Sequence, residues 1–479
     1  MSESVLSTES GELPTIARIS TRSDKLPVKE NQNLDALPGS YGWPIIGDTF
    51  KMLADPRGSL FSAHARYGNV IKSSALFQRS VSLLGPDANE LVLMDRDKNF
   101  SSRWGWHAVL DRLFRNGLML RDFEDHRAHR RIMNAAFRPQ ALESYIDQMN
   151  PVINSSIQQW ENIADFRFYD AIKQLTLDVA AVVFIGINLG KDSEKVNQAF
   201  IDTVAATLAV VRFPVPGLSL WKGIKGREFL ISYFGGMIAE KRISEGQDML
   251  SHFCKSKNEE GEYYSDADIV DHMIFLMMAA HDTTTSALST MVLALAEHPE
   301  WQDKVREECL ALHKACDNEH LAFSDLDKLE KTAWVFKEAL RLYTPVTRIA
   351  RRSIKSFEFE GHTIPANTLV GISPTFTHYM PEIWNNPEAF EPDRFSPQRA
   401  EDKKHNFAWV PFSKGAHMCI GLHFAYMQVK AVMYQFIRQY EFSLPENYVL
   451  EMQELPIPKP KDKLPLHLHR IVQRSLGST

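Results

Sequence analysis

One cysteine of the chain stands where its thiolate could bind a metal. Cys419 lies in the loop of residues 412–421, Phe-Ser-Lys-Gly-Ala-His-Met-Cys-Ile-Gly, and apolar residues at helical spacing follow directly. A helix N-terminus favours an anion, because its free N–H groups and its dipole both attract negative charge. We therefore expect a lowered thiol pKa and a metal-binding thiolate. Gly415 and Gly421 allow a tight turn and a close approach to a flat object, and Phe412 can shield the sulfur from water.

By itself, a lone cysteine is more often a small buried residue than a ligand. This loop, however, resembles the haem-binding signature of the cytochrome P450 family, Phe-x-x-Gly-x-Arg/His-x-Cys-x-Gly, at every fixed position. The resemblance implies the cytochrome P450 fold, which is mainly α with a small β-rich subdomain, and haem b (iron protoporphyrin IX) as the cofactor. It implies that Cys419 is the axial iron ligand and that His417 contacts a haem propionate, with Phe412 and Gly415 in the same cofactor-binding loop. A thiolate ligand favours O–O cleavage by pushing electron density onto the iron.

A second reactive group falls in the middle of a long predicted helix. Helical periodicity runs from residue 267 to Glu297, about 45 Å at 1.5 Å per residue, and Ser265 with an acid three residues on predicts its capped start. Residues 279–285 read Ala-Ala-His-Asp-Thr-Thr-Thr. The alanines leave room beside a cofactor, an acid followed by a hydroxyl can relay protons, and the threonine hydroxyls can bond to the i−4 carbonyl.

This segment resembles the family's distal-helix motif, Ala/Gly-Gly-x-Asp/Glu-Thr, with Ala280 at the second glycine. The resemblance implies that Ala279 lies against the haem and that Asp282 and Thr283 are the catalytic acid and alcohol. If the motif is aligned one residue later, Thr284 is the alcohol in place of Thr283. Without the resemblance, the alternative is a capped distortion in an ordinary core helix.

Basic residues occur in two further places that the family uses to hold the haem propionates. His126 and Arg130 share a helical face at i and i+4, and the resemblance implies that both contact one propionate. Arg351 lies in a predicted strand over residues 344–353. It matches a position that binds the other haem propionate in the family. The alternative for the first pair is a solvated basic helix. Phe123 stands where many relatives have glycine, so we expect a differently shaped start of this helix.

Glu338 and Arg341 share a helical face at i and i+3, and Arg394 follows about fifty residues later. Such a pair is by itself most often exposed and of little energetic weight. The family buries this Glu-Arg-Arg set beneath the cysteine loop, so the resemblance implies a buried cluster. Arg348 points nearer the pocket by strand alternation, where it meets either a polar substrate group or a surface salt bridge.

Composition limits the class of protein. The chain has 479 residues, 44% of them hydrophobic, and a net charge of −6, which gives no basic field for nucleic acid. Its four cysteines form no disulfide-like framework, which fits a reducing cytosol. We expect a polar, largely disordered tail over residues 1–36 and a single domain over 37–479. No apolar run is long enough for a transmembrane anchor, so we expect a cytoplasmic protein of the soluble bacterial type.

Three segments bear on the substrate. Residues 37–47 carry a Gly-Trp-Pro sequence that resembles branches of the family that oxidise sterols, retinoids and isoprenoids. Residues 99–116 are rich in aromatics and correspond to the family's pocket cap, although an aromatic surface helix fits equally well. Residues 213–221 form an apolar, proline-rich loop at the family's mobile lid. This loop predicts either peripheral membrane contact or a buried connector.

The resemblance implies a monooxygenase that inserts one oxygen atom from O2 into a C–H bond of a lipophilic substrate, such as a terpenoid, a sterol-like compound or a fatty acid. Electrons come from a separate ferredoxin-type donor with an NAD(P)H reductase, because no flavin or iron–sulfur segment follows the haem loop. Two alternatives stay open: an H2O2-dependent peroxygenase, and a non-catalytic haem sensor or ligand carrier.

Overall fold

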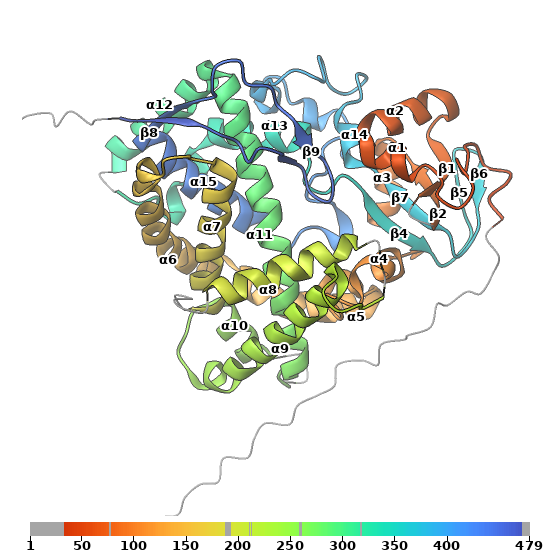
Figure 1. Cartoon of the computed structure of the whole chain (residues 1–479), viewed down its shortest axis with the longest axis horizontal. Helices are drawn as coiled ribbons and strands as arrows, with labels where there is room; N and C mark the ends of the chain where they lie inside the picture. The colour runs from red at the N-terminus through yellow and green to blue at the C-terminus, as the bar shows by residue number, and fades with distance from the viewer. Residues whose placement is uncertain are drawn as a thin grey trace, which may run out of the picture.

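The computed structural model describes residues 33–75, 78–186, 193–209, 211, 213–257, 261–316 and 319–471. Helices gather around one long central helix, α11, and a smaller β-rich part lies to one side of them, at the right in Figure 1. The predicted fold, mainly α with a small β-rich subdomain, is confirmed. Most of the predicted N-terminal tail, residues 1–32, lies outside the described residues. Leu34 and Leu37 are both buried under the β-rich part, so packing begins no later than Leu34.

The α-helices are α1 (Thr49–Ala54), α2 (Pro56–Tyr67), α3 (Pro86–Met94), α4 (Ser102–Leu110), α5 (Phe123–Met133), α6 (Pro139–Gln158), α7 (Phe168–Ala180), α8 (Ser193–Ala205), α9 (Ser219–Ile243), α10 (Met249–Lys255), α11 (Asp266–Glu297), α12 (Pro299–Cys316), α13 (Glu330–Leu342), α14 (Pro374–His378) and α15 (Leu422–Gln439). The strands are β1 (Val70–Ala75), β2 (Gln78–Leu83), β3 (Phe100–Ser101), β4 (Ile349–Ser353), β5 (Phe357–Phe359), β6 (His362–Ile364), β7 (Leu369–Ile372), β8 (Tyr440–Ser443), β9 (Met452–Gln453), β10 (Lys459–Pro460) and β11 (His467–Arg470).

The main sheet has the strand order β1-β2-β7-β4-β3, antiparallel except between β2 and β7. The strand predicted over 344–353 begins only at Ile349. The hydroxyl of Thr344 donates to the carbonyl of Leu340 at 2.8 Å, so this residue still completes the end of α13. Within β4, Arg351 lies on the buried side of the strand.

Helix α11 crosses the helical part and packs against α7, α9 and α13. Its start is the predicted one, because the side chain of Ser265 accepts a hydrogen bond from the backbone N–H of Asp268 at 3.1 Å. It ends before His298, where Pro299 begins the next helix. Among the described helices, none is both long enough and apolar enough to cross a membrane.

The start of α5 has an unusual backbone conformation, and its predicted difference in shape from relatives with glycine stays a prediction. Phe123 has a φ of +46°, a left-handed conformation that glycine adopts freely and that a bulky side chain rarely does. The helix nevertheless forms, with Glu124 and Asp125 in its first turn, where acidic side chains complement the helix dipole. Its buried face carries His126.

Candidate active site

The cysteine loop is held by its own backbone and by α3. The N–H of Cys419 donates to the carbonyl oxygen of Phe412 at 2.9 Å, which closes the loop just before α15 begins. Gly415 has a φ of +69°, and a Cβ atom built there would lie 2.1 Å from the carbonyl oxygen of Leu93. A glycine is therefore required at this turn, both for the backbone conformation and for the close approach to α3.

The thiol of Cys419 lies in a recess of the protein. Its side chain has accessible surface, yet burial raises the pKa of the thiol, against the backbone N–H of Gly421 and the charge of Arg130, which lower it. The lowered pKa expected from the helix N-terminus is therefore wrong for the polypeptide alone, because desolvation outweighs the dipole. A thiolate at this position needs a further positive charge beside the sulfur, and a bound metal ion supplies one.

Four basic side chains lie close to this recess. The rings of His126 and His417 are 3.9 Å apart between centroids. Burial and the charges of Arg130 and Arg351 lower the pKa of His126 to about 4, and burial with the same two charges holds the pKa of His417 well below its usual value. Burial also lowers the pKa of Arg351 to about 10, with Asp122 partly opposing it. The cluster is thus short of negative charge.

Two observations show that these residues fit a haem. The buried Nε2 atom of His126 has no hydrogen-bond partner among the described residues, and Arg130 forms no ion pair within them. Each can therefore meet a carboxylate from outside the chain, as a propionate would supply. The charge of Arg130 acts on both Cys419 and His126, so a potential thiolate ligand and two potential propionate-binding groups are neighbours.

The middle of α11 presents small side chains on one face. Ala279, Ala280 and Thr283 are partly accessible within an otherwise buried helix, whereas Thr284 is buried. Ala279 and Thr283 are four residues apart, and the Thr283 hydroxyl donates to the Ala279 carbonyl at 2.6 Å, which is the predicted i−4 bond. This geometry favours Thr283 over the alternative in register, Thr284, as the alcohol that faces a ligand.

Asp282 makes different contacts from its neighbour Thr283. Its carboxylate lies 3.4 Å from Nδ1 of His281 and 3.9 Å from Nζ of Lys173 on α7, beside a cavity of about 10 Å³. Burial would raise the pKa of Asp282, but His281, Lys173 and Lys459 outweigh it, and the net pKa is below the usual value. No hydrogen bond joins Asp282 to Thr283 among the described residues. The structure therefore places the predicted acid and alcohol on adjacent faces of α11, and a water molecule or a rotation is needed to connect them.

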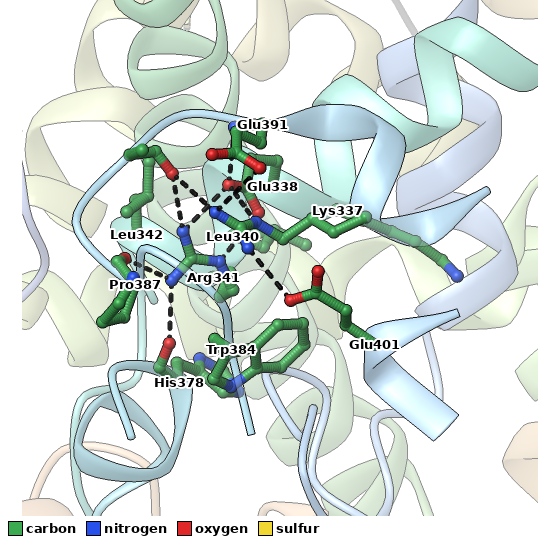
Figure 2. Close-up of polar contacts among 12 residues, drawn as sticks. Lys337, Glu338, Leu340, Arg341, Leu342, His378, Trp384, Pro387, Glu391 and Glu401 are labelled. Carbon is green, nitrogen blue, oxygen red and sulfur yellow. Dashed lines mark hydrogen bonds and ion pairs between the residues drawn. The ribbon is translucent and has the colours of Figure 1, made fainter. Parts of the chain in front are cut away.

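The Glu-Arg-Arg cluster is buried as predicted. Glu338 accepts two hydrogen bonds from Arg341, both of 2.8 Å (Figure 2). It also accepts one of 2.9 Å from Nε of Arg394. All three side chains are fully buried. The structure adds a fourth member, because Glu401 accepts from Arg394 at 3.0 Å. Sequence reasoning missed Glu401, since nothing in the motif marks it.

Two contacts join this cluster to the cysteine loop. The carbonyl of His378 accepts from Arg341 at 2.8 Å (Figure 2), and Nε2 of the same histidine accepts from the backbone N–H of Val410 at 3.1 Å. The indole N–H of Trp409 donates to the carbonyl of Lys337 at 3.3 Å. The buried charges thus fix the position of the segment that leads into the cysteine loop.

Aromatic rings enclose the loop on its inner side. Phe412 is half-buried and contacts the rings of Phe336, Trp409 and Tyr426, with centroids 5.9 to 6.3 Å apart. This packing is consistent with the predicted place of Phe412 in the cysteine loop. Its role in shielding the sulfur stays a prediction.

The segment predicted as an apolar lid is exposed where the structure describes it. Phe213 has 73% of its surface exposed, and Val215 and Leu218 are also exposed, whereas Leu220 is buried at the start of α9. The alternative of a buried connector is therefore wrong for residues 213–218. Membrane contact stays a prediction.

A long core helix and a cysteine loop with basic groups near the thiol are the elements of a haem-thiolate monooxygenase. The family model of cytochrome P450 matches residues 37–466. Cytochrome P450 136 of Mycobacterium tuberculosis is 38% identical over 445 residues, covering 91% of this chain and 89% of that protein. Beta-amyrin 28-monooxygenase of Saponaria officinalis is 26% identical, covering 90% of each chain. The solved structure of retinoic acid-bound cyanobacterial CYP120A1 has a TM-score of 0.83 at 27% identity, covering 91% of this chain and 99% of that chain.

The chain therefore belongs to the cytochrome P450 family. Membership establishes a haem-dependent monooxygenase, an enzyme that uses O2, a redox partner and a lipophilic substrate.

Proposed function

We propose that this enzyme holds haem b through Cys419 and oxidises a C–H bond of a lipophilic substrate, with electrons from a ferredoxin-type donor and its NAD(P)H reductase. One observation carries the assignment of the site. The charge of Arg130 lies close enough to lower the pKa of both Cys419 and His126, and the buried Nε2 of His126 has no hydrogen-bond partner among the described residues.

The proposed roles follow from position. His126, Arg130, His417 and Arg351 bind the two propionates, and Phe412 limits the access of water to the sulfur. Haem, when bound, supplies the one-electron and O2 chemistry that no side chain can perform. The alcohol of Thr283 holds a proton at Oγ1 on the face of α11 toward the ligand. Asp282 is ionised at neutral pH and, with His281 and Lys173, brings protons to that helix.

The proposed substrate is an isoprenoid, sterol-like or fatty acid-like compound. The exposed apolar residues of segment 213–218 give such a molecule a surface on which to enter. Proteins that this chain resembles act on or bind related compounds by their names, namely beta-amyrin and retinoic acid.

The carbon monoxide difference spectrum of the reduced protein tests the ligand directly. Wild type should show the Soret position of a thiolate-bound haem, and Cys419→Ser should lose it. Cys316→Ser removes a partly accessible thiol that lies on α12 and is the matched control. A thiolate-type spectrum in Cys419→Ser, or the absence of haem in wild type, would show that the assignment is wrong.

A further inference from the structure

Arg348 is an arginine held in an unusual position over the main sheet. It lies just before β4, and its guanidinium rests on Gly371 of β7. A Cβ atom built on Gly371 would lie 2.4 Å from both Nε and Nη2 of Arg348. Only glycine leaves the space for the planar guanidinium to lie on the sheet at this point.

The hydrogen bonds of Arg348 are few and long. Nη1 donates to the hydroxyl of Ser82 and Nη2 to that of Ser80, each at 3.3 Å, beyond the usual length for such a bond. A guanidinium has five N–H donors, so most of its capacity is unused. Both serines lie on β2 and are buried. Each hydroxyl accepts from Arg348, and the hydroxyl of Ser80 also shares a 3.3 Å hydrogen bond with that of Ser73, in which either oxygen can donate.

The charge of Arg348 is also uncompensated. Arg348 keeps part of its surface accessible, yet burial lowers its pKa, and no carboxylate among the described residues raises it. By contrast, Arg121 is 2.8 Å from Asp268, and Arg227 contacts Asp271. A partly buried charge without a partner is costly, so such a group is expected to meet an anion from outside the chain.

The position of Arg348 relates it to the proposed cofactor site. Arg351, in the propionate-binding cluster, is three residues away, which is about 10 Å at 3.3 Å per residue of strand. Strand alternation puts Arg348 on the side of β4 opposite to Arg351. The carbonyl of Ala350 and the backbone of Arg351 are covered by Gly105 of α4, the predicted pocket cap. An anion at Arg348 would therefore lie beside the cap and away from the haem edge.

We propose that Arg348, with Ser80 and Ser82, forms a subsite for the carboxylate of a lipophilic acid substrate. One guanidinium, with its paired N–H donors, and two hydroxyls match the shape and the single negative charge of a planar carboxylate. The rest of the molecule extends from Arg348 toward the haem site, so oxidation takes place away from the acid group. This inference rests on the proposed function, because it assumes a lipophilic substrate that reaches the haem site.

Paired ligands test the subsite. All-trans-retinoic acid, hexadecanoic acid and oleanolic acid are each compared with the matching methyl ester, and Kd is measured from the shift in the haem Soret band. Wild type should bind at least one acid about 10-fold more tightly than its ester. Arg348→Gln should remove that preference and leave the ester Kd unchanged, and Arg348→Lys should keep part of it.

A second variant guards against a structural explanation. Gly371→Ala keeps Arg348 but forces its guanidinium to move, so the same loss of acid preference is expected. The carbon monoxide spectrum and the haem content of every variant are measured alongside. The proposal is overturned if no acid is preferred over its ester, if the preference survives Arg348→Gln, or if that variant loses haem, which would make Arg348 a propionate ligand. A wild type without a thiolate spectrum would instead contradict the proposed function.

Discussion

Arg394 donates to Glu338 at 2.9 Å across 56 residues of sequence, and both side chains are fully shielded from solvent. The same carboxylate is shared with Arg341. Two guanidinium groups therefore share this buried negative charge, and Arg394 also pairs with Glu401. Through His378 and Val410, their position also determines that of the chain that enters the cysteine loop.

Replacing Glu338 with Gln should therefore destabilise the protein strongly. The amide keeps the shape but removes the charge that two buried arginines share, and breaking a buried pair costs about 3–5 kcal/mol. We expect a loss of free energy of unfolding of that size, measured in urea, with a lower ratio of haem to protein. Glu388→Gln, at an exposed ion pair with Arg57, is the control and should change stability by less than about 1 kcal/mol. Equal stability of the two variants would contradict a structural role for the cluster.

Acid should destabilise the loop through His378. Its Nε2 accepts from the N–H of Val410, and its Nδ1 bonds to the hydroxyl of Thr344, which itself donates to Leu340. The ring is therefore the neutral tautomer with its proton on Nδ1. Burial, with the charge of Arg341, lowers the pKa of His378 to about 3.

The direction in which the free energy of unfolding changes with pH follows from this lowered pKa. The unfolded chain binds a proton below about pH 6.5, whereas the folded chain does so only near pH 3, so the contribution is present above pH 6.5 and is lost as the pH falls. Between these limits the free energy of unfolding should fall by up to about 1.4 kcal/mol per pH unit from this group. Urea unfolding at a series of pH values should show a shallower slope in His378→Gln. His423→Gln, at an exposed position of α15, is the control for loss of a histidine. Identical slopes in wild type and His378→Gln would refute the argument.

Gly415→Ala should weaken the cysteine loop. The new methyl group would meet the carbonyl of Leu93, which is backbone and cannot swing away, and the residue would be held at a φ of +69°. The left-handed conformation alone costs about 1–2 kcal/mol. We expect lower thermal stability and a several-fold loss of haem on gel filtration. Gly235→Ala, in the exposed middle of α9 with no atom near its Cβ position, should be neutral or slightly stabilising. A fully stable Gly415→Ala protein would argue against the tight turn.

Thr283→Ala tests the proposed proton transfer. Loss of the hydroxyl should lower product formed per O2 consumed by about 10-fold or more, because a positioned acid contributes at least that much. Thr283→Ser should restore it, and Thr284→Ala, at the buried position, should leave it near wild type. Product yields and O2 uptake are measured with a ferredoxin and reductase pair. If Thr283→Ala matched wild type, a sensor would be favoured, and turnover with H2O2 alone would favour a peroxygenase.

Short motifs allowed much of this site to be predicted. The loop around Cys419, the start of α11 at Ser265 and the pair Glu338–Arg341 all depend on residues within a few positions of each other. Local hydrogen bonds and helical spacing decide such features, so the printed sequence is enough.

Features that depend on distant partners could not be predicted. The contact of Lys173 with Asp282 joins two helices separated by more than a hundred residues, and Glu401 has no motif around it. The thiol pKa of Cys419 was predicted with the wrong sign, because the helix terminus is visible in sequence and the extent of burial is not.

The raised thiol pKa of Cys419 also bears on how the holoenzyme is assembled. If Cys419 binds the iron as proposed, its thiol would have to release its hydrogen ion to the solvent when the cofactor binds. Maturation would then be an acid-releasing reaction, favoured by alkaline medium and opposed by acidification.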